Sequence, residues 1–339
     1  MRVLFFIQGL TVAASRYRVL QYLPLLKQAG IDVDVVEFPK GIAGWARCLG
    51  LVRQTDLVFV QRKRPPLLII MLLKGMGKKI VYDFDDAIMF KNSLSSHPYS
   101  LRRKLSFRRM LRFADLVIAG NEFLRSEAMK YSRNIHVLPT PIDIERYSPK
   151  SYGPRDTIHI GWIGDHGSIH YMESYKEVWE ELGRRFKNVS LAIICDVFIE
   201  TQDIPLVRRV WSSEKEVEYL QDLDIGVMPL FDDLWSQGKC GFKIIQYMGV
   251  GLPVVCTPVG INRDAVEPGT NGFWAETMSE WVEKLTVLTE NAALREKMGR
   301  AGRERMLERY TVQACAPLMI EWLKGVGKRD GGYGKSSPS

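Results

Sequence analysis

Short apolar runs alternate with amphipathic segments through both halves of the chain. Ten of these runs have the length and the β-branched content of buried strands. They are RVLFFIQ, IDVDVVEF, DLVFVQ, KIVYDF and DLVIAG in the first half, and TIHIGWIG, VSLAIIC, VRRVWS, DIGVMPL and LPVVCT in the second. Strands that alternate with helices predict parallel sheets joined by right-handed crossovers. The pattern therefore predicts an α/β protein.

Two helices are predicted most clearly by apolar spacing. The segment 15–30 lies between the first two strands, and Gly30 stands where a helix would end. The segment 311–326 has the pattern of a terminal amphipathic helix. The residues after it, 327–339, lack apolar anchors and are predicted to be a disordered tail.

The alternation restarts after the proline-rich segment LPTPIDIERYSPKSYGPRD, which is typical of a linker. We therefore expect two Rossmann-like doubly wound domains, 1–150 and 151–310, with the terminal helix returning to the first. Open parallel sheets bind ligands at the carboxyl ends of their strands. Two such domains are expected to face a central cleft that holds the site.

Composition narrows the class of protein. The chain has 339 residues, 46% of them hydrophobic, and no run of about 18 apolar residues that would predict a membrane span. Its first apolar run is interpreted as a strand rather than a signal peptide. Five scattered cysteines without CxxC spacing favour reduced thiols in a cytoplasm over disulfides or a zinc site.

Charge is distributed unevenly along the chain. Residues 1–150 contain 25 Lys and Arg against 12 Asp and Glu, whereas the remainder contains 22 against 27. The segments 62–79 and 101–112 combine clustered basic residues with apolar ones, which predicts peripheral contact with an anionic membrane. A solvated basic face is the alternative. A nucleic-acid partner is not expected, because the clusters lack interleaved aromatic residues.

The stretch GKCGFKIIQYMGVGLPVV, residues 238–255, joins a glycine-lysine loop to a helical pattern and a buried strand. Gly238 and Gly241 allow close approach of a ligand, and the start of a helix attracts phosphate through its N–H groups and dipole. Lys239 and Lys243 add full positive charge. Gln246, one turn into the helix, is then placed to bond a ribose hydroxyl, and its alternative role is a hydrogen bond with neighbouring backbone.

The run 238–274 resembles the donor-binding segment of retaining glycosyltransferases with the GT-B fold, notably glycosyltransferase family 4 (glycosyl transferases group 1). There a Glu-x7-Glu pattern precedes a Met-x-x-Gly-x-Pro-Val-Val strand and a Gly-x-x-Gly-type turn. IHIGWIG is similar to the opening strand of the nucleotide-sugar domain, LPTPIDIERYSP to the linker, and ASRYRVLQYLPLLKQAG to the first loop and helix of a subset of members. The resemblance extends over nearly the whole chain.

The resemblance implies transfer of a sugar, with retention, from a UDP- or GDP-linked donor to a glycan or lipid-linked acceptor in polysaccharide or glycolipid synthesis. It implies no metal and no cofactor. It assigns to the donor Lys239, Gly241, Phe242, Lys243, Gln246 and Gly164. Two positions depart from the pattern: Gly238 replaces the first Glu, and Asp165 replaces an Arg. The cationic contact with the diphosphate is therefore expected from the two lysines.

A second cluster of candidates follows the strand KIVYDF, where Asp83, Asp85 and Asp86 form an Asp-x-Asp pattern. Alone, this pattern is typical of a divalent metal site in GT-A transferases. The resemblance instead makes Asp85 the candidate catalytic residue, at a position where many members have a His. A carboxylate there could steer the acceptor hydroxyl or stabilise positive charge at the anomeric carbon. Capping of the next helix by Asp85 or Asp86 is the alternative.

The loop QGLTVAASRYR follows the first strand and supplies the acceptor or phosphate candidates. Gly9 suits close approach to a ligand, and Ser15 is predicted to cap the helix that begins there. Arg16 and Arg18 are candidates to bind donor phosphate or an anionic acceptor, or else they are surface charges. The five histidines fit no metal or triad spacing, and His166 alone is expected at the cleft.

Two other classes of function stay open at this point. A GT-B-fold nucleotide-sugar epimerase would need acid and base groups flanking a ring carbon and would consume donor without acceptor. A noncatalytic sugar-nucleotide-binding protein is suggested by the departures at Gly238 and Asp165.

Overall fold

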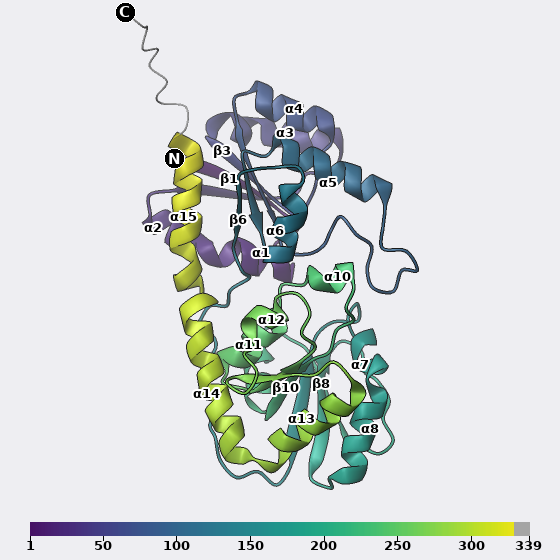
Figure 1. The fold of residues 1–339 in the computed structure, drawn as a ribbon. Coiled ribbons are helices and arrows are strands. Elements are labelled where there is room, and N and C mark those ends of the chain that lie inside the picture. Colours follow the sequence, from purple (N-terminus) through teal and green to yellow (C-terminus); the bar gives the residue numbers. More distant parts are fainter. Residues whose placement is uncertain (329–339) are drawn as a thin grey trace, which may run out of the picture. The chain divides into compact units, whose positions relative to one another are not determined.

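The fold is taken from a computed structural model that describes residues 1–328 (Figure 1). Within them the chain forms two compact units. Unit 1 contains Met1–Thr140 together with helix α15 (Val312–Lys328), and unit 2 contains Pro141–Thr311. Of the tail predicted over 327–339, the first two residues belong to α15, and 329–339 lie outside the described residues.

Unit 1 is built on a six-stranded parallel sheet with the strand order β2-β1-β3-β4-β5-β6. The strands are β1 (Arg2–Ile7), β2 (Asp32–Glu37), β3 (Leu57–Gln61), β4 (Lys79–Phe84), β5 (Leu116–Ala119) and β6 (Ile135–Val137). The first five confirm the strands predicted from the apolar runs. The sequence pattern missed β6, because three residues at a sheet edge are too few to show a periodicity.

The helices of unit 1 follow the strands in alternation. They are α1 (Ala13–Arg18), the 3₁₀ turn η1 (Leu20–Tyr22), α2 (Leu23–Gln28), α3 (Gly41–Gln54), α4 (Leu67–Gly75), α5 (Leu101–Phe113) and α6 (Glu122–Met129). The single helix predicted over 15–30 is wrong. Val19 leaves helical geometry with a φ of −132°, and Pro24 begins α2 within its first turn. Gly30 does end α2, with a φ of +75°.

Helices cover both faces of this sheet (Figure 1). On one face, α2 and α15 bury Leu26, Met319 and Leu323 against the strand residues Val3 and Phe5. On the other face, α3 brings Trp45 onto Phe6 and α5 brings Phe107 onto Phe84. The terminal helix is therefore part of the core of unit 1, although it lies far from it in the sequence.

Unit 2 has a second six-stranded parallel sheet, with the order β12-β11-β10-β7-β8-β9. Its strands are β7 (Ile158–Ile163), β8 (Val189–Cys195), β9 (Leu206–Val210), β10 (Ile225–Met228), β11 (Val254–Cys256) and β12 (Gly272–Trp274). Five were predicted and are confirmed. The missed strand, β12, again has only three residues and lies at an edge.

The helices of unit 2 pack on both faces of its sheet. They are α7 (His170–Ser174), α8 (Lys176–Arg185), α9 (Glu216–Gln221), α10 (Leu234–Gln237), α11 (Phe242–Gly249), α12 (Asn262–Ala265), α13 (Met278–Glu290) and α14 (Ala292–Arg309). Tyr247 and Met248 of α11 are buried in one core, and Trp179 of α8 meets Trp281 of α13 in the other. The helix and strand predicted within 238–255 are thus present as α11 and β11.

The boundary between the units lies at Thr140, ten residues before the expected position. The segment that follows is tied to unit 2 by its backbone. Ile142 N donates to Tyr310 O over 3.0 Å, and Lys150 N donates to Val250 O over 2.9 Å. Among residues 1–328, no helix is both long and apolar enough to cross a membrane.

Candidate active site

Each sheet has a point where the strand order reverses, and open parallel sheets bind ligands in the crevice at this point. In unit 1 the reversal lies between β1 and β3, and in unit 2 it lies between β7 and β10. The loops that leave these four strands are therefore where functional side chains are expected. Gly9, Gly164, Lys239 and Gly241 lie in the loops of the connections that leave β1, β7 and β10, and α1 and α11, which belong to the same connections, contain most of the other candidates.

In unit 2, the loop after β7 is shaped by Gly164. Its N–H donates to Ile194 O over 3.0 Å, and a Cβ at this position would lie 2.2 Å from the ring of Trp162. Only glycine fits there. The Ser168 hydroxyl donates to Asp165 Oδ1 over 2.9 Å and closes the loop, which leaves Asp165 and His166 exposed.

His166 pairs with Asp196, the residue that follows β8. Its Nδ1 lies 2.7 Å from Asp196 Oδ2, and its backbone N–H donates to Asp196 Oδ1 over 2.8 Å. This hydrogen bond and the negative charge of Asp196 raise the pKa of His166 and, in turn, lower the pKa of Asp196. The pair therefore places an ionisable imidazole in the loop at the carboxyl end of β7. Asp196 was missed in the sequence because its partner lies 30 residues away.

Helix α11 begins at Gly241, which has a φ of +63°. A Cβ there would lie 2.5 Å from Ile261 Cγ2, so both conformation and space require glycine. Among the described side chains none caps this end of the helix. The amides of Phe242 and Lys243 open the first turn, where the helix dipole favours an anion.

Two lysines lie close to this helix start. Lys239 Nζ is 5.4 Å from the ring centroid of Trp235, and Lys243 Nζ is 5.3 Å from that of Trp162. Burial lowers the pKa of Lys243 to about 8, and the charge of Lys239 acts in the same direction while Asp165 opposes it. The environment of Lys243 is therefore short of negative charge, which an anionic ligand would supply.

Gln246 does not have the placement expected of a ribose ligand. It is buried, and its Nε2 donates to Tyr147 Oη over 3.0 Å. Tyr147 in turn donates to Glu216 Oε1 over 2.6 Å, and Trp211 Nε1 donates to Glu216 Oε2 over 2.9 Å. This buried network corrects the prediction: Gln246 fastens α11 to the 141–150 segment and to the start of α9. A polar residue on a buried helix face was the only signal for it in the sequence.

In unit 1, Gly9 and Ser15 lie together at the β1 edge. Gly9 N donates to Ser15 Oγ over 3.4 Å, and Ser15 Oγ donates to Gln61 Oε1 at the end of β3 over 3.0 Å. The predicted cap is wrong, because the N-cap of α1 is Val12 and Ser15 is buried in the third helical position. Its hydroxyl ties the loop after β1 to β3.

Arg16 and Arg18 have different surroundings. The Arg16 guanidinium stacks over the Tyr17 ring at 4.4 Å and is partly exposed. Arg18 is fully buried: it forms an ion pair with Asp83 and donates to Leu138 O over 2.6 Å. Burial raises the pKa of the Asp83 carboxyl, and the Arg18 charge opposes that rise. The expectation that Arg18 binds a ligand is corrected to an internal ion pair, since no surface of it reaches solvent.

Asp85 and Asp86 meet Arg62, which follows β3. Arg62 Nε lies 3.4 Å from Asp85 Oδ1, and its Nη2 is paired with Asp86. Arg62 has a φ of +60° and is held there because its N–H donates to Asp83 O over 2.7 Å. Such a conformation is costly in a non-glycine residue and is found mostly at functional sites. The sequence gave no sign of this role for Arg62.

The alternative roles of these aspartates do not fit the structure. The next helix, α5, is capped by Ser100 and not by Asp85 or Asp86. Asp83 is committed to Arg18, so the three carboxylates do not converge. In the part of the chain that the structure describes, no group of three or more His, Cys, Asp or Glu side chains is arranged to hold a metal ion.

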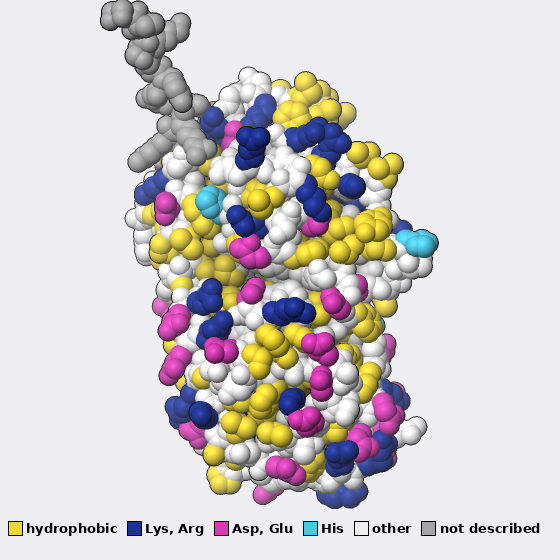
Figure 2. Space-filling view, viewed as in Figure 1, with side chains coloured by type: hydrophobic (Ala, Val, Ile, Leu, Met, Phe, Trp, Pro, Cys, Tyr) yellow, Lys and Arg dark blue, Asp and Glu magenta, His cyan; other side chains and the backbone are white. Residues whose placement is uncertain are grey.

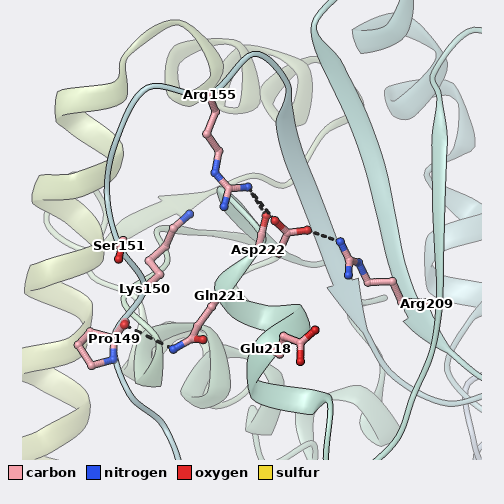
Figure 3. Close-up of a pocket in the computed structure, with 8 residues that line it drawn as sticks. All are labelled: Pro149, Lys150, Ser151, Arg155, Arg209, Glu218, Gln221 and Asp222. Atoms are coloured by element: carbon pink, nitrogen blue, oxygen red, sulfur yellow. Dashed lines mark hydrogen bonds and ion pairs between the residues drawn. The ribbon is translucent and has the colours of Figure 1, made fainter.

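A pocket of about 510 Å³ occurs elsewhere in unit 2, and none of the candidate residues lines it (Figure 3). Its cations are already paired with acids. Arg155 lies 3.2 Å from Asp222, which also pairs with Arg209, and Lys150 lies 3.0 Å from Asp224. This internal neutralisation makes the pocket a poor site for an anionic ligand.

Comparison with known proteins points to one class. Residues 175–291 match the family described as glycosyl transferases group 1, and this segment includes Lys239, Gly241 and Lys243. A protein of Bacillus subtilis (strain 168), named as the teichuronic acid biosynthesis glycosyltransferase TuaH, is 24% identical over 262 residues, which cover 67% of this chain and 62% of that protein. The chain thus spans about three-fifths of the length of this curated relative.

Solved structures share the fold across 96% of the chain. The Anabaena protein HepE, in complex with UDP and glucose, matches over 99% of its own length with a TM-score of 0.69 and 17% identity. Sucrose-phosphate synthase from Thermosynechococcus elongatus matches over 98% of its length with a TM-score of 0.71 and 13% identity. The chain has the GT-B fold, as predicted, and the family and relative together support a group 1 glycosyltransferase.

Proposed function

We propose that this protein is a retaining glycosyltransferase that moves a sugar from a nucleotide diphosphate-sugar to a hydroxyl of a glycan or lipid-linked acceptor. The pathway we propose is cytoplasmic polysaccharide or glycolipid synthesis. The family match over 175–291 and the relative named for teichuronic acid biosynthesis support this proposal. The UDP complexes of HepE favour UDP over GDP as the nucleotide to test first.

The start of α11 is the observation that carries the proposal. Gly241 turns the backbone so that the first amides of the helix open toward the edge of the sheet, and Lys239 and Lys243 lie near it. Lys243 has a pKa near 8 because burial disfavours its charge. A diphosphate would restore full protonation of this ammonium, and helix, amides and lysines would all act on the same anion.

The chemistry asked of these groups is electrostatic. The bond between the anomeric carbon and the diphosphate oxygen breaks, a bond from the acceptor oxygen to that carbon forms on the same face, and the acceptor proton passes to the departing phosphate oxygen. Negative charge on the diphosphate grows as the bond breaks. Preorganised amides and ammonium groups stabilise that charge more in the transition state than in the ground state. No metal or cofactor is part of this proposal.

In unit 1 we propose that the acceptor-side groups lie at the edge formed by β1, β3 and β4. Asp85 is the candidate to orient the acceptor hydroxyl or to stabilise positive charge at the anomeric carbon, and Gly9 leaves room for a ligand at the same edge. The contact of Asp85 with Arg62 supports a carboxylate held ready in one orientation.

Thermal shift in EDTA with UDP, GDP, ADP, CMP and dTDP is the first test. We expect stabilisation by UDP or GDP that is lost in Lys243→Ala. Absence of a shift with every nucleotide, even after magnesium is restored, would contradict the donor site. Release of nucleotide is then measured from sugars linked to the nucleotide that stabilises the protein, with and without candidate acceptors. This assay distinguishes a transferase from an epimerase and from a noncatalytic protein. Acceptor-dependent release supports a transferase, whereas donor isomerisation without acceptor would indicate an epimerase, and binding without turnover a noncatalytic protein.

A further inference from the structure

Helices α4 and α5 lie side by side on one face of unit 1. They connect β3 to β4 and β4 to β5, which are neighbours in the sheet, and successive right-handed crossovers place both helices on the same face. Hydrogen bonds join α5 to the segment that leads into α4: Arg109 Nη2 donates to Pro65 O over 3.2 Å, and Arg64 Nη1 donates to Arg103 O over 3.4 Å. The outer surfaces of the two helices therefore form one continuous face, which we call the α4–α5 face.

This face exposes large apolar side chains that the fold does not need for its own core. The inner side of α4 already buries Ile70 and Leu73. On the outer side, Leu68 is 77% exposed and Met71 56%, and on α5 Leu101 is 72% and Leu105 51% exposed. Figure 2 shows hydrophobic side chains gathered over this part of unit 1. Clustered exposed apolar groups of this size mark an interaction surface.

The charge of the same segments is entirely of one sign. Residues 62–79 and 101–112 together contain twelve Lys and Arg and no Asp or Glu. Lys63, Arg102, Lys104 and Arg112 are exposed, and dark-blue side chains adjoin the apolar ones in Figure 2. Two of the twelve are paired with acids from outside these segments, Arg62 with Asp85 and Asp86 and Lys74 with Asp115, and exposed Lys is depleted in protein interfaces. Apolar groups ringed by cations complement a bilayer with anionic headgroups.

We propose that the α4–α5 face docks on the surface of an anionic lipid bilayer. Leu68, Met71, Leu101 and Leu105 enter the boundary between headgroups and acyl chains, and the exposed cations contact headgroup phosphates. Helix α4 has nine residues and is about 14 Å long, so it lies in the interface and does not span the bilayer. This proposal goes beyond the sugar transfer proposed above, because it names a surface and a partner that do not depend on turnover.

The test is co-sedimentation of the full chain with vesicles of phosphatidylcholine, alone or mixed with phosphatidylglycerol. We expect binding to the mixed vesicles that weakens at high salt. The double variant Arg102→Gln/Lys104→Gln should bind them about thirty-fold more weakly, since each cation near the surface is worth about 1 kcal/mol. Leu68→Ser/Leu105→Ser should weaken binding about a hundredfold, through loss of the two inserted side chains.

Matched controls come from unit 2. Lys187→Gln/Lys297→Gln removes two exposed cations, and Met278→Ser/Leu307→Ser replaces side chains that are 46% and 41% exposed. Both controls should bind vesicles like the wild type. All the changed positions are exposed, so circular dichroism and melting temperature should be unchanged.

Three results would overturn the proposal. The first is wild-type protein that stays in the supernatant with anionic vesicles. The second is binding of the α4–α5 variants that is as strong as that of the controls. The third is self-association in solution, without any lipid binding, that Leu68→Ser/Leu105→Ser abolishes. Transfer to a soluble acceptor, measured on the same variants, keeps the two proposals apart. Loss of vesicle binding with intact transfer supports the docking face, and vesicle binding by a wild type without transfer would contradict only the proposed function.

Discussion

The cationic side chains at the carboxyl edges of the two sheets have different kinds of partner. In unit 1 two arginines at the edge are paired with carboxylates of the same unit: Arg18 with Asp83, and Arg62 with Asp85 and Asp86. In unit 2 Lys243 at the edge lies over the indole ring of Trp162. An aromatic face attracts a cation but does not neutralise it.

A cation that is paired with a carboxylate contributes to the fold, whereas a cation that lies on an aromatic ring keeps a charge that a ligand can use. A buried ion pair such as Arg18–Asp83 holds a sheet edge in one geometry, and removing one partner leaves the other uncompensated. An ammonium whose pKa is lowered by burial, such as that of Lys243, is instead stabilised in its charged form by an incoming anion. We therefore expect substitutions at Arg18 and Asp83 to act on stability and those at Lys243 to act on nucleotide binding and turnover.

The largest expected effect on stability comes from breaking the buried pair in unit 1. Arg18→Met should cost about 3–5 kcal/mol of unfolding free energy, because it strands the Asp83 carboxylate in the core. Denaturant unfolding measures this cost. The double variant Arg18→Met/Asp83→Leu should recover much of it, and a double variant no more stable than the single one would argue against the ion pair as the cause.

The largest expected effect on activity comes from Lys243→Ala. Loss of one preorganised positive group at a developing charge typically lowers turnover a hundredfold to a thousandfold, about 3–4 kcal/mol. Melting temperature should change little, because the ammonium is already disfavoured in the fold. Nucleotide release in a continuous assay measures the effect, with Lys243→Arg as the control that keeps the charge. Equal turnover in the alanine variant and the wild type would remove Lys243 from the mechanism.

Two glycine substitutions separate the cost of a positive φ from the cost of a steric clash. Gly241→Ala should cost about 2–4 kcal/mol, since φ is +63° and the new Cβ would lie 2.5 Å from Ile261. Gly30→Ala is the matched control. Its φ is +75°, but a Cβ added there would have nothing within 4 Å, so we expect a loss of about 1–2 kcal/mol of unfolding free energy. Thermal unfolding compares the two. Nucleotide affinity should fall only in the Gly241 variant, and an equal fall in both would point to a global effect.

The smallest effect is the pH dependence of nucleotide binding. The Lys243 pKa is about 8 in the unliganded protein, and an anion favours the charged form. Above about pH 7, where the phosphates of UDP are fully ionised, affinity should therefore fall as pH rises through 8, approaching tenfold per pH unit until the bound-state pKa is reached. Isothermal titration calorimetry from about pH 7 to about pH 9 tests this. Lys243→Arg should show a flat profile, and a fall of the same size in that variant would assign the titration to another group.

Local pattern was sufficient for most of the fold. Ten strands were predicted, eight of them because burial on both faces of a parallel sheet leaves a continuous apolar signature, whereas β2 and β9 at the sheet edges are partly exposed. The two missed strands, β6 and β12, have three residues each and lie at sheet edges, where that signature is too short to detect. The break at Val19 was missed because helical periodicity continues across it.

The candidate site was predictable to a smaller extent. Gly241 and the two lysines were predicted by a local rule, because a glycine loop before a helix favours phosphate wherever it occurs, whereas Gly164 was predicted only by the family resemblance. The roles of Arg18 and Gln246 did not follow from any local rule. Their partners, Asp83 and Tyr147, are 65 and 99 residues away.

The amino-acid order by itself determined the alternation of strands and helices, the glycine-lysine loop at the start of α11, and the one-signed charge of 62–79 and 101–112. Only the tertiary structure decided which polar groups are paired with other groups of the protein and so are not available to a ligand. That outcome depends on the order of strands in each sheet, which brings distant side chains to one edge and pairs Arg18 and Gln246 internally. It also decided which apolar residues of α4 face outward, since a helix of apolar residues shows no preferred side until the sheet beneath it covers one.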